Sequence, residues 1–245
     1  LIFETKNGIE IISHKFLDEK KILEIKFDKK KYQVEINLIG KIQIKNVLMA
    51  ILAARKSGLK FEKILSVIHE LKPVEGRLEK IGKIKNKSKV ILDYAHTPEA
   101  LKLSLLNLKE QFPSSKISLV FGCGGDRDFK KRSIMGNIAD QYSDRIYLTD
   151  DNPRSENPLK IRKDIKKGIK KIKVQEISNR KKAIYEAIKD LNTGDLLLVA
   201  GKGHEKIQDY GKKKLFFSDK DIILKSIKLK NKFLSSNLKL NIIKE

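Results

Sequence analysis

Three short apolar runs, each ending in a cluster of glycine and polar residues, constrain the fold of this chain more than any other feature. The runs occupy residues 117–121, 146–148 and 196–200. Runs of this length with such boundaries are typical of buried parallel strands. The polar clusters that follow them, residues 122–128, 151–154 and 201–205, are then loops at the strands' carboxyl ends. Because open α/β sheets bind ligands at that edge, the sequence predicts a crevice there.

The first part of the chain follows a different pattern. Apolar and polar residues alternate over residues 8–38, which is typical of half-buried antiparallel strands. Helical spacing follows over residues 44–56 and 61–71, and Pro73 ends the second helix. Strand and helix patterns then alternate, which indicates a parallel sheet with covering helices.

We therefore expect an α/β protein with a boundary near residue 75. Residues 1–75 are predicted to form part of an α/β domain with antiparallel strands and two helices. Residues 76–245 are predicted to form a Rossmann-like, mostly parallel sheet with flanking helices. The chain opens on Leu1 and on polar, strand-like sequence, so we also expect it to be an internal piece of a longer protein.

Residues 90–92 are predicted to form the first strand of the second region. Thr97 is a good N-cap and Pro98 suits the first position of a helix. Helices are expected over residues 99–112, 131–142, 158–172 and 180–191. Ser218, with Asp221 three residues later, resembles a capping arrangement that starts the last helix. The pattern from Lys230 onward assigns no element.

The net charge of +23 raises nucleic acid or an anionic membrane as a partner. Only 8 of the 54 basic residues are arginines, and the lysines are spread along the whole chain. This distribution indicates a lysine-rich solvated surface rather than a binding stripe, and aromatic interleaving is missing. No run of about 18 apolar residues or signal peptide occurs, and a single cysteine gives no disulfide framework. We expect a cytoplasmic protein, monomeric, with no nucleic-acid or membrane partner.

Arg127 and Arg154 are the strongest candidates for ligand binding in the predicted crevice. A planar guanidinium suits bidentate recognition of a carboxylate or a phosphate. The alternative is a salt bridge to Asp126, Asp128 or Asp151.

Glu205 lies four residues after Gly201, beyond a predicted tight turn. A carboxylate there can accept hydrogen bonds from a substrate ammonium. The alternative is a helix-start carboxylate near the positive end of a helix dipole. No phosphate loop of the G-x-x-x-x-G-K-[ST] kind occurs in the sequence.

Asp93 and His96 flank Tyr94 after the strand at residues 90–92. The aspartate could bind ribose hydroxyls and the histidine could donate to a phosphate, although a histidine at a strand end is more often structural. Cys123 lies between glycines, and no histidine lies at a spacing that indicates a base for a catalytic thiol. We therefore interpret Cys123 as structural. Four histidines without ligand spacing predict no zinc site.

Five motifs in order give the chain a resemblance to the Mur ligases of peptidoglycan synthesis. They are Gly76-Arg77-Leu78-Glu79, Asp93-Tyr94-Ala95-His96-Thr97-Pro98, residues 122–128 with Lys131-Arg132, Asp151-Asn152-Pro153-Arg154, and Gly201-Lys202-Gly203-His204-Glu205. Two positions depart from the family pattern: Gln43 replaces an asparagine and Ser133 replaces a proline. The first change puts one nucleotide-side contact in doubt.

The resemblance implies that residues from 76 onward form the family's carboxyl-terminal domain and that residues 1–75 form the end of its central ATPase domain. Family members are ATP-dependent, Mg²⁺-requiring ligases that phosphorylate a substrate carboxylate to an acyl phosphate, which an incoming amine attacks. The family's phosphate loop, magnesium ligands and carbamylated lysine have no counterpart in this sequence. The resemblance therefore implies no catalytic or metal-binding residue here, and an inactive chain if it stands alone.

The closest resemblance is to members that add meso-diaminopimelate to UDP-MurNAc-L-Ala-D-Glu. It implies that one set of residues binds diaminopimelate: Arg127, Asp151, Asn152, Pro153, Arg154, Gly201 and Glu205. It implies a nucleotide-binding set in which Asn46 faces the adenine while the rest contact the ribose and phosphates: Asn46, Arg77, Asp93 and His96.

Arg154 also bears on the choice of substrate, because the family's lysine-adding members lack this arginine. Lysine has no distal carboxylate, and a buried arginine left unpaired costs about 2–5 kcal/mol. That cost disfavours lysine by roughly 30- to several-thousand-fold. The alternatives are a lysine-adding or relaxed ligase, and a non-catalytic remnant that binds nucleotide or a partner.

Overall fold

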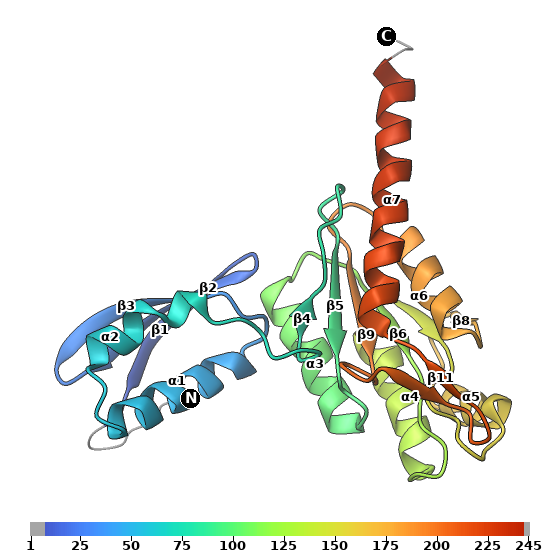
Figure 1. Ribbon diagram of the computed structural model, residues 1–245, viewed down its shortest axis with the longest axis horizontal. Helices are drawn as coiled ribbons and strands as arrows, with labels where there is room; N and C mark the ends of the chain where they lie inside the picture. Colours follow the sequence, from blue (N-terminus) through green and yellow to red (C-terminus); the bar gives the residue numbers. More distant parts are fainter. Residues whose placement is uncertain (1–7, 243–245) are drawn as a thin grey trace. The chain divides into compact units, whose positions relative to one another are not determined.

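The computed structural model describes residues 8–242 and divides them into two compact units (Figure 1). The first unit comprises the chain up to Val74 together with Asn107–Pro113. The second unit comprises Glu75–Leu106 and the chain from Ser114 onward. In the described part of the chain, no helix is long and apolar enough to span a membrane.

The first unit is a three-stranded antiparallel sheet covered by helices. Its strands, in the order β1-β2-β3, are β1 (Glu10–Leu17), β2 (Lys20–Phe27) and β3 (Lys30–Ile36). Its helices are α1 (Ile42–Lys56), α2 (Phe61–Ser66) and the 3₁₀ turn η1 (Ile68–Glu70). Alternate residues such as Leu23 and Ile25 of β2 are buried against α1 and α2, which confirms the predicted strand pattern.

The second predicted helix of this unit, residues 61–71, is shorter than expected. It ends at Ser66 because Val67 has φ −107° and ψ −3°, outside the usual helical range. The chain then tightens into η1, which keeps Ile68 in the core.

The second unit is built on a six-stranded sheet in the order β4-β5-β9-β6-β7-β8. The strands are β4 (Glu79–Lys80), β5 (Lys89–Asp93), β6 (Ile117–Phe121), β7 (Arg145–Leu148), β8 (Val174–Glu176) and β9 (Leu196–Ala200). All neighbours pair in parallel except β4 with β5. Every residue of β6 and β9 is buried, as expected for strands covered on both faces. The predicted fold class is confirmed.

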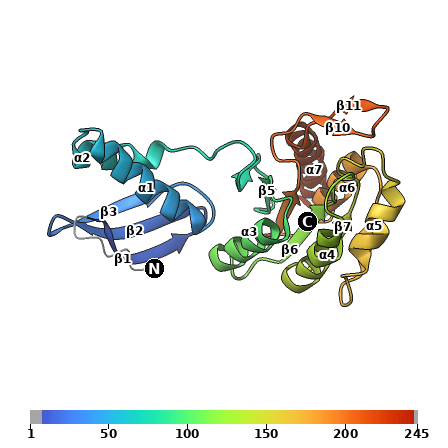
Figure 2. The same ribbon diagram turned by 90° about the horizontal axis from the view of Figure 1, so that it is seen from below.

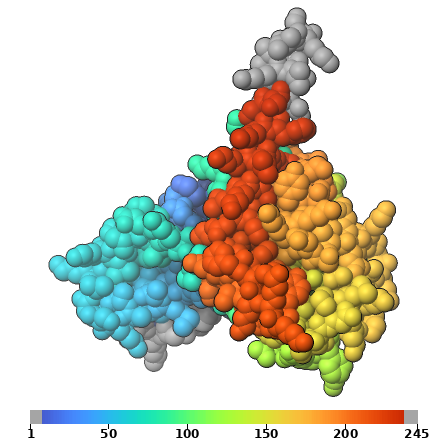
Figure 3. Space-filling view, turned by 45° about the vertical axis from the view of Figure 1, so that its right-hand side comes forward, coloured from blue at the N-terminus to red at the C-terminus, as the bar shows by residue number. Residues whose placement is uncertain are grey.

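Helices cover both faces of this sheet: α3 (Pro98–Gln111), α4 (Lys130–Tyr142), α5 (Pro158–Lys166), α6 (Arg180–Lys189) and α7 (Asp219–Ile242). Figure 2 shows α6 and α7 on one side of the sheet and α3 and α4 on the other. One core cluster joins Ile184 and Ile188 of α6 and Ile223 of α7 to the strands. In Figure 3, α7 runs along the surface of this unit beside a small hairpin, β10 (Ile207–Asp209) and β11 (Lys214–Phe216).

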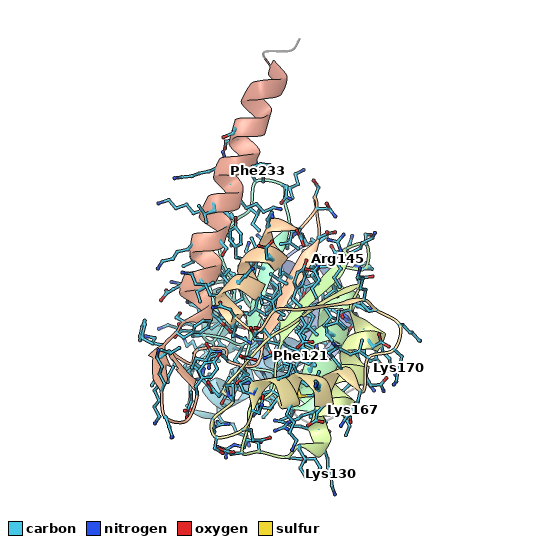
Figure 4. All side chains as sticks on the ribbon, turned by 90° about the vertical axis from the view of Figure 1, so that its right-hand side faces the viewer. Phe121, Lys130, Arg145, Lys167, Lys170 and Phe233 are labelled. Carbon is cyan, nitrogen blue, oxygen red and sulfur yellow. The ribbon has the colours of Figure 1, made fainter. Side chains whose placement is uncertain are left out.

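The predicted caps are present. The backbone N–H of Ala100 donates to Oγ1 of Thr97 (3.2 Å), and that of Asp221 donates to Oγ of Ser218 (3.2 Å). Lysines project outward from this unit, as Figure 4 shows for Lys130, Lys167 and Lys170, whereas Phe121 lies inside.

The predicted helix over residues 158–172 is wrong in its second half, because α5 ends at Lys166. The carboxylate of Asp140 in α4 accepts the backbone N–H groups of Lys170, Lys171 and Ile172 at 2.8–3.1 Å. These bonds hold the segment in a turn that leads into β8. The end of the chain, which the sequence pattern did not assign, continues α7 to Ile242.

Candidate functional site

The three polar loops lie at one edge of the second unit's sheet. They follow β6, β7 and β9, which are immediate neighbours in the order β9-β6-β7 and run parallel. Parallel strands place their carboxyl ends at the same edge, so the loops meet there as predicted. Strand β5, beside β9, adds Asp93 to this edge.

The loops after β6 and β7 interlock at Gly125. Its N–H donates to the carbonyl oxygen of Asn152 (2.9 Å), and its own carbonyl oxygen accepts from Nη1 of Arg154 (2.7 Å). A Cβ atom at Gly125 would lie 1.9 Å from the carbonyl oxygen of Pro153. The two loops can approach this closely only because residue 125 is glycine.

Neither candidate arginine forms an ion pair within residues 8–242. Arg154 has φ 53°, its backbone N–H donates to Asp209 O (3.0 Å), and its guanidinium donates to Gly125 O. Arg127 is exposed, and its Nη1 donates to the carbonyl oxygen of Asp126 (3.2 Å). The salt-bridge alternative is therefore not what the structure contains, and both guanidinium groups keep donors for a ligand.

Asp126 helps to hold these two loops together. Its carboxylate accepts from the Ser155 hydroxyl (2.6 Å) and backbone N–H (3.2 Å), and these hydrogen bonds hold its pKa below the usual value. Its own N–H donates to Oε1 of Glu156 (2.6 Å).

Arg132, which is only 1% exposed, completes this support. It donates to Glu156 (2.7 Å) and Asp164 (3.3 Å). The sequence reasoning gave Arg132 and Glu156 no individual role. Arg132 is one of only eight arginines in a lysine-rich chain, which is a signal that could have marked it.

Asp151 presents an unpaired acceptor at the centre of the site. Its Oδ2 atom is buried and has no hydrogen-bond partner among the described residues. Gly201 lies directly against it, with φ 115°, and a Cβ atom at Gly201 would be 2.7 Å from that oxygen. Any other residue at position 201 would strain the backbone and bring its Cβ atom too close to this oxygen of Asp151. A free buried carboxylate oxygen is suited to an ammonium ligand.

Asn152 and Glu205 form a second polar group beside Asp151. Nδ2 of Asn152 donates to Oε2 of Glu205 (3.0 Å), and Nζ of Lys202 donates to both residues. Burial alone would raise the pKa of Glu205. The hydrogen bond and charge of Lys202, with hydrogen bonds from Asn152 and Tyr94, outweigh burial and hold the pKa below its usual value. Glu205 is therefore an anion at neutral pH, and it does not begin a helix.

Asp93 is occupied by the protein's own donors. Its carboxylate accepts from Leu78 N (2.7 Å), Ala95 N (3.0 Å) and the Ser104 hydroxyl (3.0 Å). Burial raises its pKa, although these hydrogen bonds oppose the increase. The aspartate thus joins the segment at Leu78 to the end of β5.

The other predicted nucleotide-binding residues are more open. The guanidinium of Arg77 stacks on the Tyr94 ring at 4.7 Å, and Nδ1 of His96 lies 2.9 Å from the carbonyl oxygen of Tyr94. Asn46 belongs to the first unit, where its Nδ2 donates to Oε1 of Gln43 (3.1 Å). The structure thus brings Arg77, Asp93 and His96 together in the second unit.

Cys123 is buried, and desolvation raises the pKa of its thiol to about 12. A thiol with that pKa is not a nucleophile at neutral pH, which agrees with the structural role predicted for it. Among residues 8–242, no group of three or more histidine, cysteine, aspartate or glutamate side chains is placed to hold a metal ion.

Known proteins resemble this chain in both sequence and fold. A family profile described as "Mur ligase, glutamate ligase domain" matches residues 76–203. The UDP-N-acetylmuramoyl-L-alanyl-D-glutamate–2,6-diaminopimelate ligase of Rickettsia rickettsii is 42% identical over 226 residues, which are 92% of this chain and 46% of that protein. The ligase of the same name from Buchnera aphidicola is 46% identical over 195 residues, 79% of this chain and 38% of that one. The chain thus spans about half the length of these relatives, or less.

Solved structures give the same picture. A diaminopimelate ligase of the same name superposes with a TM-score of 0.72 at 30% identity, covering 93% of this chain and 47% of that one. The MurF ligase of Thermotoga maritima, in complex with ADP, superposes with a TM-score of 0.63 at 17% identity, covering 92% of this chain and 47% of that one. The second likeness concerns the fold alone.

Proposed function

The chain belongs to the Mur ligase family, and from that premise we propose that its second unit binds meso-diaminopimelate for an ATP-dependent ligase. That ligase would join the amino acid to UDP-MurNAc-L-Ala-D-Glu in cytoplasmic peptidoglycan precursor synthesis. ATP would convert the terminal carboxylate of the dipeptide into an acyl phosphate with release of ADP. The amino group of diaminopimelate would then attack the acyl carbon and displace inorganic phosphate, which forms the amide bond. The role proposed for this chain is to bind and orient that amino group.

The proposal rests on one observation: the same site contains hydrogen-bond acceptors for an ammonium group and hydrogen-bond donors for carboxylates. The unpaired Oδ2 atom of Asp151 and the carboxylate of Glu205 provide acceptors for an ammonium group. The guanidinium groups of Arg127 and Arg154 provide donors for carboxylates. Asn152 and Pro153 set the path of the loop between them, and Gly201, without a side chain, leaves room beside the oxygen of Asp151. A zwitterionic amino acid with an additional carboxylate matches this arrangement.

The residues proposed to face the nucleotide are Asn46, Arg77, Asp93 and His96. Arg77 retains donors for ribose or phosphate oxygens, and Nδ1 of His96 donates to the carbonyl oxygen of Tyr94, so Nε2 of the neutral ring can accept from a ribose hydroxyl. Asp93 acts by holding the segment that carries Arg77. The described residues do not fit a magnesium site, so no step of the proposal passes through Mg²⁺. Since the sequence contains no phosphate loop, we expect no ATP turnover by these 245 residues alone.

Calorimetry with meso-diaminopimelate and with L-lysine tests the proposal. We expect the chain to bind diaminopimelate weakly and lysine more weakly still. Arg154→Ala should abolish the preference, because it removes the donor proposed to bind the distal carboxylate. Arg55→Ala, at an exposed arginine of the first unit, is the matched control and should leave the preference unchanged. Equal affinity of the wild-type chain for both amino acids would favour a lysine-adding or relaxed ligase instead.

A further inference from the structure

Lys202 is a buried cation whose three donors are all used. Its side chain is 0% exposed, and its Nζ atom lies 2.8 Å from Oδ1 of Asn152, 3.0 Å from Oε2 of Glu205 and 2.7 Å from the carbonyl oxygen of Ile207. A buried ammonium is costly unless it is paired and hydrogen-bonded, and this one meets both conditions. With every donor used, Lys202 has none left for a ligand.

Lys202, together with the backbone N–H of Asp209, determines which end of the Asn152 amide faces Glu205. An ammonium group only donates, so the oxygen of the amide must face it. The N–H of Asp209 donates to the same oxygen (3.0 Å). The amide nitrogen is therefore directed to Oε2 of Glu205, at 3.0 Å. Without the ammonium, one of the two groups that fix this orientation is lost.

Lys202 also determines which oxygen of Glu205 remains for a ligand. Oε2 accepts from both Lys202 and Asn152. Among the described residues, Oε1 has only a long contact with the hydroxyl group of Tyr94, at 3.4 Å. A carboxylate oxygen can accept two hydrogen bonds, so Oε1 retains capacity. The ammonium thus occupies one side of the carboxylate and leaves the other side open.

We propose that Lys202 is a positioning residue for the acceptor amino acid: directly and through Asn152, it holds Glu205 in the orientation in which its carboxylate binds the substrate's ammonium group, without touching the substrate. This inference rests on the function proposed above. The competing explanation is that Lys202 only anchors β10 to the loop through Ile207 and affects stability alone.

The affinity at neutral pH, measured together with the pH dependence of binding, separates the two explanations. Glu205 is faced by Lys202 on its own loop, by Asn152 after β7, by the Tyr94 hydroxyl after β5 and by the positive charge of Arg180 in α6. When Lys202 is removed, the effect of burial, which raises the pKa of Glu205, is opposed by fewer groups. Loss of an ammonium ligand on acidification should then begin at a higher pH. A purely structural role would raise that pH as well, because Nζ of Lys202 lies 3.0 Å from Oε2, but it would leave the affinity at neutral pH unchanged.

The experiment uses the 245-residue chain, its Lys202→Met variant and Lys206→Met, an exposed lysine four residues away, as the matched control. The side-chain carboxyl carbon of Glu205 is titrated by NMR without ligand, and meso-diaminopimelate binding is measured by calorimetry between about pH 3 and pH 8, a range that spans the ordinary carboxyl pKa. We expect Lys202→Met to raise the pH at which Glu205 titrates and to weaken binding at neutral pH by roughly ten- to hundredfold. Lys206→Met should match the wild type in both measurements.

Unchanged Glu205 titration in a folded Lys202→Met variant would overturn the inference, and so would unchanged affinity. If the variant does not fold, Lys202→Gln, which keeps a donor but loses the charge, takes its place with the same expected direction. A wild-type chain that binds no amino acid at any pH would overturn the proposed function and the positioning role with it. The NMR titration distinguishes that failure, because it would still show whether Lys202 controls Glu205.

Discussion

Arg180 and Asp219 form a doubly hydrogen-bonded ion pair in the interior of the second unit. Nε of Arg180 lies 2.8 Å from Oδ1 of Asp219, and Nη2 lies 2.7 Å from Oδ2. Both side chains are 0% exposed. The residues begin α6 and α7, and Nη2 of the arginine also donates to the carbonyl oxygen of Ala200 at the end of β9 (3.0 Å). The pair therefore joins two helices to the strand that leads into the site.

Arg180→Met should lower the free energy of unfolding by about 3–5 kcal/mol, because it leaves the Asp219 carboxylate buried without a counter-charge. Urea denaturation followed by circular dichroism measures the change. Lys181→Met, at the next residue of α6 but exposed, is the control and should change stability by less than about 0.5 kcal/mol. Equal effects of the two substitutions would mean that the pair contributes nothing beyond the packing of its side chains.

Gly125→Ala should disrupt the contact between the loops after β6 and β7. The new methyl group would lie 1.9 Å from Pro153 O, so the loops must separate, and Arg154 then loses its acceptor at Gly125. We expect a loss of about 1–3 kcal/mol in stability and of measurable diaminopimelate binding. Ser114→Ala, in an exposed turn, should preserve both. Wild-type affinity in Gly125→Ala would contradict the interlocked arrangement of the loops.

The buried strands of the second unit could be predicted because each is a continuous apolar run. Strands β6, β7 and β9 stand out in the sequence, and their parallel pairing follows from the helices between them. Strands β4 and β8 have two and three residues, which is too short for a periodic pattern. The hairpin of β10 and β11 is largely exposed, so its residues carry no core signal.

Residue types at the sheet edge predicted the candidate site only in part. Glycines and arginines after β6 and β7 indicated that these loops bind a ligand, because both residue types stand out in a chain rich in lysine. Lys202 gave no such signal, since a lysine with three buried acceptors looks the same in sequence as the many lysines on the surface. The engagement of Asp93 by Leu78, Ala95 and Ser104 likewise depends on contacts between distant segments. These roles could not be predicted because the sequence does not show which groups Lys202 and Asp93 contact in the folded protein.

Asp140→Asn should destabilise the turn between α5 and β8. An asparagine side chain would place an amide donor against the backbone N–H groups of Lys170, Lys171 or Ile172, at a cost of about 1–3 kcal/mol. Burial raises the pKa of Asp140, but these hydrogen bonds outweigh it and lower the pKa below the usual value. The stabilisation is therefore complete above the unfolded pKa of about 4 and disappears as pH falls through the folded value.

Urea denaturation at neutral pH and at about pH 3, below the unfolded carboxyl pKa, checks this prediction. The wild type should be more stable than Asp140→Asn at neutral pH, and the difference should shrink in acid. Asp144→Asn is a less suitable control because Asp144 accepts from Ile117 N–H (2.7 Å), so Asp28→Asn, at an exposed aspartate in the turn between β2 and β3, serves instead. A difference that is independent of pH would exclude the carboxylate charge as its source.

The lowered pKa of Lys21 predicts that the free energy of unfolding increases at alkaline pH. Its side chain is buried in β2 and its ammonium donates to the carbonyl oxygen of Leu38; burial lowers its pKa to about 8. The unfolded value is about 10.4, so between these two pH values the unfolded chain binds more protons and stability rises with pH. At about 1.4 kcal/mol per pKa unit, the gain approaches about 3 kcal/mol.

The gain should appear as a change in the stability difference between the wild type and Lys21→Met, because other groups titrate equally in both proteins. Urea denaturation at about pH 7 and pH 10, on either side of the lowered pKa, should show the wild type gaining on the variant as pH rises. Lys26→Met, at an exposed lysine of the same strand, should show no such change. If the difference in free energy of unfolding between the wild type and Lys21→Met does not change over this range, Lys21 keeps an ordinary pKa. Its ammonium is then not desolvated at Leu38.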